Sequence, residues 1–215
     1  MSTQKTVTQK VLFVWGFIVI IWSFYRSIFL TSLPIWLDEF ITKPLVFLVP
    51  VFWYIHKYES GGILSALSLQ KKKITVIIPG LIVGLFFLIL GFIYHLRFKT
   101  TVSNLPEVII PLITISLATA ITEEILSRGF VLKRLLGETK HQSIAIMKAT
   151  LLHSLLRIPI LFTLPSLTGW AVMRIMAIDL LLSIIISLLY IQGKSLYPVI
   201  VARFLYIVSI TLFLM

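Results

Sequence analysis

Long apolar stretches recur along this sequence, and they constrain its fold more than any other feature. Stretches of 18 or more residues match the length that a helix needs to cross a bilayer. The chain is 59% hydrophobic and only 13% charged, whereas an ordinary soluble domain carries about 25% charged residues. Because the apolar runs are continuous and do not alternate with polar residues, they favour helices over a membrane barrel. We therefore predict an all-α, polytopic membrane helix bundle.

Proline, glycine and charged residues divide the chain into about seven expected membrane spans. The expected spans are residues 11–31, 41–56, 74–96, 106–122, 143–164, 169–191 and 195–215. The fourth is expected to continue as a more polar helix to about Leu136, where Gly137 ends it. We expect one integral membrane domain over residues 1–215, with N-terminal spans in 1–105 and a core in 106–215. Gly80, Gly84 and Gly91 would permit close helix approach or are ordinary membrane-helix glycines, and we assign them no functional role.

The distribution of Lys and Arg over the loops predicts the orientation. Cytoplasmic loops of membrane proteins carry an excess of these residues. With the N-terminus inside, the outer side holds Lys43, Arg97 and Lys99. The inner side holds Lys5, Lys10, Lys57, Lys71, Lys72, Lys73, Lys133, Arg134, Lys140, Lys148 and Lys194. We therefore expect the N-terminus inside and the C-terminus outside.

The positive charge indicates contact with membrane lipids and not with nucleic acid. The formal net charge is +11, but the sequence shows no basic stripe interleaved with aromatic residues. The Lys71-Lys72-Lys73 run is expected to anchor the third span at anionic lipid. The chain contains no cysteine, which excludes disulfides and thiol catalysis.

A short set of ionisable residues falls inside the expected spans. Each costs about 2.5–3.5 kcal/mol to insert, so each is a functional candidate that faces the bundle interior. Arg26 lies near the end of its span, and we expect it to reach the headgroups. The others are Glu123, Glu124, Arg128, His153, Arg157, Arg174, Asp179 and Arg203.

The segment from Glu123 to Phe130 is the most informative part of the sequence. Glu124 and Arg128 are four residues apart, so on a helix they form an ion pair. Glu123 points about 100° away and remains available for another task. A buried carboxylate without a cation suits a general base near neutral pH. The competing interpretation is a helix-stabilising ion pair with a spare glutamate at the membrane boundary.

His153 lies in an apolar stretch and is followed by Arg157 on the same helix face. A lone histidine on such a face is usually a core residue. Glu and His from neighbouring helices, however, can jointly activate one water molecule. A zinc site needs at least three protein ligands, and one His with two adjacent Glu residues is an undersupplied set. We expect no metal and no other cofactor, although zinc stays an open alternative.

Three motifs in order resemble the CPBP family of CAAX prenyl endopeptidases and bacteriocin-processing or immunity proteins, also called the Abi family. They are the Glu-Glu-x-x-x-Arg-Gly segment, the His about 30 residues later, and a last helix that opens with Ser195 to Ala202. The resemblance covers roughly residues 106–215. It implies an intramembrane endopeptidase fold in which a Glu and a His activate water for peptide hydrolysis.

The resemblance implies particular roles for residues of this chain. Glu123 would be the general base and His153 its partner on the water, while Glu124 and Arg128 would be a structural pair. The sequence departs from the family pattern at three positions. Ala149 stands where the second motif usually has Phe, and Arg203 and Ile207 stand where the third motif has His and Asn. Both usual oxyanion donors are therefore replaced.

Two interpretations of Arg203 compete. Its guanidinium offers five N–H donors and a fixed positive charge, so it could stabilise an oxyanion. Alternatively, it could pair with Glu123 and weaken that carboxylate as a base. Charge balance favours the second interpretation, because Arg128, Arg157, Arg174 and Arg203 stand against Glu123, Glu124 and Asp179.

Three functions follow from these alternatives. The first is an intramembrane peptidase that cleaves a membrane-embedded peptide or protein, in bacteriocin processing or self-immunity. The second is a catalytically inactive relative that acts as a membrane scaffold or immunity factor. The third, a small transporter, is disfavoured because the sequence shows no inverted repeat. The resemblance places the protein in a bacterial plasma membrane.

Overall fold

The computed structural model describes residues 6–29, 34–70, 73–98, 105–162 and 169–213, and these residues form helices joined by short connections. The chain order is α1 (Val7–Phe29), α2 (Ile35–Leu37), η1 (Asp38–Thr42), α3 (Lys43–Tyr58), α4 (Ile63–Ala66), η2 (Ile74–Ile77), α5 (Ile78–Phe98), α6 (Leu105–Glu124), η3 (Ile125–Leu132), α7 (Lys133–Glu138), α8 (Gln142–Phe162), α9 (Trp170–Gly193) and α10 (Tyr197–Phe213). The segments η1 and η3 are π-helical. The all-α prediction is confirmed.

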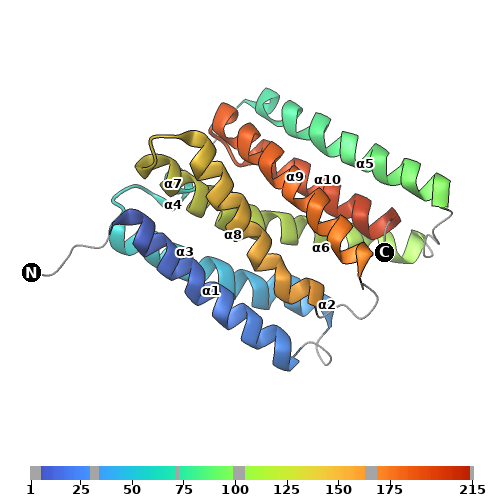
Figure 1. Cartoon of the computed structure of the whole chain (residues 1–215), viewed down its shortest axis with the longest axis horizontal. Coiled ribbons are helices and arrows are strands. Elements are labelled where there is room, and N and C mark those ends of the chain that lie inside the picture. The colour runs from blue at the N-terminus through green and yellow to red at the C-terminus, as the bar shows by residue number, and fades with distance from the viewer. Residues whose placement is uncertain (1–5, 30–33, 71–72, 99–104, 163–168, 214–215) are drawn as a thin grey trace, which may run out of the picture.

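The long helices lie in two groups (Figure 1). α1, α3 and α8 lie on one side, α5, α9 and α10 lie on the other, and α6 crosses behind them. α10 packs against α5, α6 and α9, and α8 packs against α9 and η3. α10 is therefore an inner helix that three others cover, and residues on it can meet partners from several directions.

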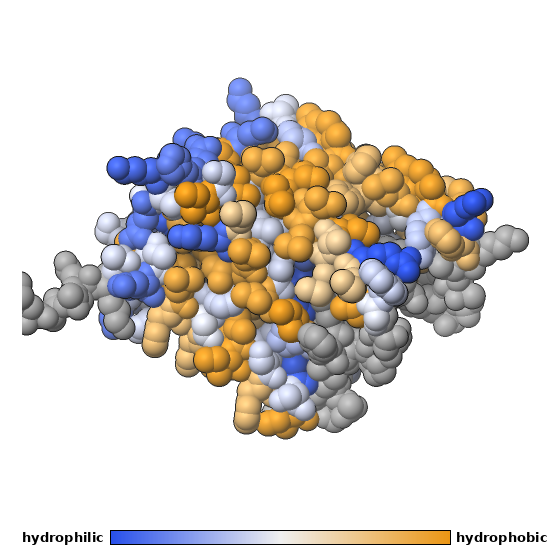
Figure 2. All heavy atoms as spheres, in the orientation of Figure 1, coloured by the Kyte–Doolittle hydropathy of each residue, from blue (hydrophilic) through white to orange (hydrophobic). Residues whose placement is uncertain are grey.

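The outer surface of the bundle is apolar. Phe13, Ile20 and Phe24 on α1 are each more than 60% exposed, and so is Ile82 on α5. On the face in Figure 2, hydrophobic residues cover the middle, and hydrophilic residues gather toward the end where α1 begins. Within the described part of the chain, four helical segments are long and apolar enough to cross a membrane, namely Val7–Ile28, Ile74–Phe98, Ile109–Glu138 and Val172–Gly193. The protein is therefore an integral membrane protein.

Each of the seven expected spans overlaps a helix, and the parts at residues 30–31, 163–164 and 214–215 lie outside the described residues. Seven membrane crossings and their orientation stay predictions. α10, with 17 residues, is apolar but shorter than the four segments above. The fourth helix runs without a break through η3 and α7 to Glu138, two residues past the expected end at Leu136. Gly137 therefore lies inside its last turn. Of the lysines used to predict the orientation, Lys5, Lys71, Lys72 and Lys99 lie outside the described residues.

One end of the bundle, which we call the basic end, joins the start of α1, the end of α3, α7 and the end of α9. The backbone N–H groups of Val7 and Thr8 donate to the Glu138 carboxylate at 2.6 and 2.8 Å. Arg134 forms an ion pair with Glu59 at 2.7 Å. The carboxylate of Glu138 thus satisfies helix N–H groups that have no partner within α1.

The glycines of α5 allow its backbone to touch α10. A Cβ atom at Gly80 would overlap the carbonyl oxygen of Pro198, and one at Gly84 would lie 2.6 Å from the side chain of Leu205. Gly91 similarly faces Ser209, whose hydroxyl donates to the Phe87 carbonyl at 3.0 Å. Close helix approach, one of the two interpretations of these glycines, is what the structure contains.

We predict that Gly80→Ala separates α5 from α10 and destabilises the protein. The new methyl group would meet backbone atoms that cannot move aside, so we expect a loss of about 1–3 kcal/mol. The thermal midpoint of the purified protein in detergent measures this loss. Gly16→Ala is the matched control, because nothing lies within 4 Å of a Cβ atom at Gly16. Equal midpoints for the two variants would contradict the prediction.

Candidate functional site in a buried ion cluster

Charged side chains from five parts of the chain meet inside the bundle. They come from η1 and α3, from α6 and η3, from α8, from α9 and from α10. Glu123, Glu124, Arg128, His153 and Arg203 are each at most 1% exposed. We call the following set the ion cluster: Glu39, Lys43, Glu123, Glu124, Arg128, His153, Arg157, Asp179 and Arg203.

Arg203 lies at the centre of the ion cluster. Its Nη1 donates to Oδ1 of Asp179 at 2.6 Å, and its Nη2 donates to Oε2 of Glu123 at 3.0 Å. The same Nη2 lies 2.9 Å from Nε2 of His153. A fourth group, Oε1 of Glu124, lies 3.9 Å from Nε. One guanidinium therefore joins α6, α8 and α9 to α10.

The hydrogen bonds fix the tautomer of His153. A guanidinium nitrogen only donates, so Nε2 of His153 accepts the hydrogen bond from Arg203. The hydrogen of the neutral ring is then on Nδ1, which lies 2.9 Å from the Ser127 hydroxyl oxygen. Ser127 follows Glu123 by four residues, so the two side chains lie on one face of the helix. Ser127 contacts His153 and Glu123 accepts from Arg203, so these two contacts place His153 and Arg203 side by side.

Both carboxylate oxygens of Glu123 are engaged in ion pairs. Its Oε1 accepts from Nζ of Lys43 at 3.0 Å, and its Oε2 accepts from Arg203 at 3.0 Å. Lys43 is 1% exposed. The interpretation in which Arg203 pairs with Glu123 agrees with this geometry, whereas the one in which Glu123 lacks a cation does not, because α3 and α10 each bring a cation to it.

Lys43 and Glu39 are members of the site that the sequence analysis missed. Nζ of Lys43 lies 2.9 Å from Oε2 of Glu39, which also accepts from the Thr119 hydroxyl at 2.6 Å. The sequence analysis counted Lys43 as an outer-side charge at the start of a span. The signal that could have found the pair is its spacing, because Glu39 and Lys43 are four residues apart.

Glu124 and Arg128 lie beside this centre. Arg128 Nη1 lies 3.0 Å from Oε1 of Glu124. Its Nη2 donates to the carbonyl and the hydroxyl of Ser183 on α9, at 2.9 and 2.5 Å. The pair therefore joins η3 to α9. The π-helical turn of η3 begins directly after Glu124, and all eight of its residues are buried, in keeping with the frequent occurrence of π-turns at functional sites.

The remaining ionisable residues of the sequence analysis lie at different distances from the centre. Oδ1 of Asp179 accepts from both Arg203 and Arg157, at 2.6 and 3.0 Å. Arg157 is partly accessible, with its side chain 20% exposed. Arg174 is exposed near the start of α9. Arg26, expected to reach the headgroups, instead pairs with Asp38 at 2.7 Å.

The charges of the ion cluster balance. The cations are Lys43, Arg128, Arg157 and Arg203, and the carboxylates are Glu39, Glu123, Glu124 and Asp179. With His153 neutral, four positive charges face four negative charges. A buried charge without a partner is strongly destabilising, so this balance is a condition for the bundle to form.

The donor set does not fit a divalent cation. Among the residues that the structure describes, no three His, Cys, Asp or Glu side chains are grouped as metal ligands. Glu123, His153 and Asp179 all face Arg203. A metal ion would have to replace that guanidinium.

The fold and the ion cluster together define a membrane-embedded helix bundle with a Glu–His site between its helices. A comparison with family models gives a match over residues 104–208, to the family described as type II CAAX prenyl endopeptidase Rce1-like. The match covers just under half of the chain and supports the resemblance found in the sequence. The matched segment contains every residue of the ion cluster except Glu39 and Lys43. Searches of the curated proteins and of the solved structures gave no match.

We predict that Lys43→Met destabilises the protein strongly, because it leaves Glu123 and Glu39 buried without their shared cation. Loss of one partner of a buried pair costs about 3–5 kcal/mol. The free energy of unfolding in detergent, measured by denaturant titration, checks this. Lys57→Met is the matched control, since Lys57 is exposed. If Lys43→Met were as stable as the control, the interpretation of Lys43 as part of the ion cluster would fail.

Proposed function

We propose that this chain is a membrane-embedded, Rce1-like protein that binds a membrane-associated peptide or protein without cleaving it. Membership of its core in the Rce1-like family suggests the framework of an intramembrane protease. The observation that carries the proposal is the position of Arg203 Nη2, within 3.0 Å of both Glu123 Oε2 and His153 Nε2.

Hydrolysis by a Glu–His pair requires both side chains to hold one water molecule. A water that bridges them would lie at hydrogen-bond distance from each. Arg203 Nη2 fills that position. The water and the guanidinium nitrogen cannot occupy it together, so Arg203 acts here as a permanent occupant of the water site.

Glu123 is poorly placed to take a proton. Its two oxygens face Lys43 and Arg203 at 3.0 Å each. Accepting a proton would neutralise the carboxylate and remove one of the two carboxylate partners of each cation. In a low-dielectric interior that loss is large. The arrangement therefore favours a fixed, charged Glu123 over a working general base.

The site also lacks free hydrogen-bond donors to stabilise an oxyanion. Ile207 has no donor, and both terminal nitrogens of Arg203 already donate to Asp179, Glu123 and His153. Removal of one oxyanion donor typically lowers the rate by about 10²–10³. A chain that lacks both usual donors and holds its base in ion pairs is better suited to binding. Self-immunity in a bacterial plasma membrane, or a scaffold role, is the setting that we propose.

One observation supports a second candidate function, peptide hydrolysis. Glu123 and His153 converge on a single nitrogen atom, which is the geometry that a shared water needs. A movement of Arg203 away from this position would open it and direct the guanidinium toward a developing oxyanion. In this second candidate, Arg203 is an oxyanion donor.

We predict that Glu123→Gln leaves the proteins of the surrounding membrane unchanged. The test is quantitative profiling of N-terminal peptides from cells that express the wild-type protein or the variant at equal levels. Because we propose that Glu123 is structural, we expect no peptide that depends on it. New N-termini that occur with the wild-type protein and disappear with Glu123→Gln would overturn the proposal and favour the peptidase.

We further predict that Arg203→His combined with Ile207→Asn creates a Glu123-dependent peptidase. The histidine side chain is shorter than that of arginine and leaves space for a water between Glu123 and His153, and the new His and Asn restore two oxyanion donors. Cleavage should appear in the same N-terminal profile and vanish when Glu123→Gln is added. Arg203→His alone is the control, and size-exclusion chromatography verifies that each variant is folded. A folded double variant without cleavage would show that the convergence of Glu123 and His153 is insufficient.

A further inference from the structure

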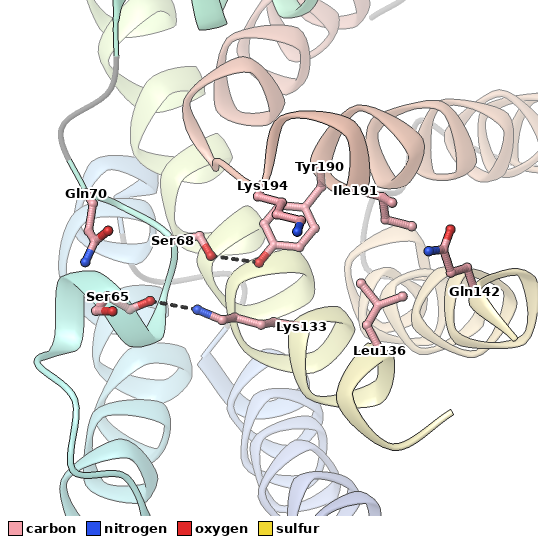
Figure 3. Close-up of a pocket in the computed structure, with 9 residues that line it drawn as sticks. All are labelled: Ser65, Ser68, Gln70, Lys133, Leu136, Gln142, Tyr190, Ile191 and Lys194. Atoms are coloured by element: carbon pink, nitrogen blue, oxygen red, sulfur yellow. Dashed lines mark hydrogen bonds between the residues drawn. The ribbon is translucent and has the colours of Figure 1, made fainter. Parts of the chain in front are cut away.

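A polar cavity lies at the basic end of the bundle, away from the ion cluster. Its volume is about 510 Å³. Figure 3 shows that α4 and the segment after it, α7, α8 and the end of α9 surround it. The lining residues are Ser65, Ser68, Gln70, Lys133, Leu136, Gln142, Tyr190, Ile191 and Lys194.

The lining of this cavity suits an anion. All nine residues are neutral or positive, and Lys133 and Lys194 carry the charge. Hydroxyl groups of Ser65, Ser68 and Tyr190 and the amides of Gln70 and Gln142 provide further donors. The nearby carboxylates are engaged elsewhere, since Glu59 pairs with Arg134 and Glu138 accepts from Val7 and Thr8.

The two lysines retain the capacity to bind a ligand. Lys133 Nζ donates to the carbonyl of Ser65 at 2.7 Å (Figure 3), which uses one of the three N–H groups of an ammonium. Lys194 directly follows α9, where a cation is favourable even without a ligand. Lys133 lies at no helix terminus, because α7 continues η3 without a break. An anionic ligand in the cavity would contact both cations.

The cavity wall is held in place by contacts between distant parts of the chain. The Ser68 and Tyr190 hydroxyls lie 3.0 Å apart, and Ser68 and Lys194 both have positive φ angles of 58° and 44°. Such left-handed residues other than glycine are uncommon and persist where their surroundings hold them. The cavity is thus part of the fold and not a chance gap between loops.

The depth of the cavity matches the headgroup region of a membrane. Lys133 lies near the end of the apolar segment Ile109–Glu138, and Lys194 immediately follows the segment Val172–Gly193. Basic pockets between helices at this level bind the phosphate groups of anionic lipids. Leu136 and Ile191 supply an apolar side to the same cavity, which suits the glycerol and upper chain of a lipid.

We propose that this cavity binds the phosphate group of an anionic phospholipid through Lys133 and Lys194. Ser65, Ser68 and Gln70 precede the segment that matches the Rce1-like family, so part of the site lies outside that segment. The proposal concerns a site separate from the ion cluster. It stands whether or not the protein cleaves peptides.

The test is a titration of the purified full-length protein in detergent with phosphatidylglycerol or phosphatidylcholine, with lipid binding measured by native mass spectrometry. We expect tighter binding of phosphatidylglycerol. Lys133→Gln combined with Lys194→Gln should weaken it by roughly twentyfold, because each lysine near anionic lipid contributes severalfold. The control is Lys57→Gln combined with Lys140→Gln, which removes the same charge from exposed positions and should change binding by less than about twofold.

Equal losses in the two double variants would overturn the proposal, because they would show a diffuse attraction of the basic end. Gln70→Glu is a further variant that keeps the hydrogen bond of Lys133 to Ser65, so it tests the cavity without the folding defect that the lysine variants could have. It places a negative charge in the cavity. It should weaken phosphatidylglycerol binding about as much as the lysine variants, and unchanged binding would also overturn the proposal. Inorganic phosphate is added as a competitor. If it displaced phosphatidylglycerol at equal concentration, the ligand would be free phosphate and not a lipid.

Discussion

Arg203 donates from two nitrogens to Asp179, Glu123 and His153, which belong to three different helices. Inside a membrane bundle these groups are not hydrated by bulk water, so each needs a charged or hydrogen-bonding partner within the protein. The rest of the ion cluster follows from this. Arg157 shares Asp179, Lys43 shares Glu123, and Glu39 balances Lys43. If Arg203 were neutral, the carboxylates around it would lose the charge that allows them to be buried.

The same contacts link the two parts of the chain. Residues 104–208 match the Rce1-like family, yet Glu123, at the heart of that segment, takes one of its two cations from α3. The N-terminal helices therefore do more than surround the core. They supply Lys43 to Glu123, which therefore lies between Lys43 and Arg203 in a network of buried charges. In such a network the cost of desolvation offsets much of the attraction, but loss of any one member leaves a buried charge uncompensated.

The helices could be predicted from the sequence, because the length of an apolar run is a local property that can be compared directly with the thickness of a bilayer. Glu124 and Arg128 could be placed together for the same reason, since spacing along one helix decides their distance. The partners of Glu123 were harder to predict. Arg203 was recognised as one of two alternatives from its position in the third motif, but only the packing of α10 against α6 places its Nη2 between Glu123 and His153. Lys43 was placed at the outer membrane boundary, because a lysine at the start of a membrane span usually lies at the surface of the protein. Its burial depends on the packing of η1 and α3 against α6, which no single-helix pattern reveals.

The order in which the chain is made gives the ion pair of Lys43 and Glu123 a further meaning. The two residues are separated by 80 positions, so Lys43 is synthesised and reaches the membrane well before its second carboxylate exists. Until then Glu39, four residues away, is the partner within reach, and the pair can enter the bilayer as a neutral unit. When α6 follows, Glu123 meets a cation that is already in place. Glu39 would thus neutralise Lys43 before Glu123 is inserted. In the folded protein Glu39 still contacts both Lys43 and Thr119.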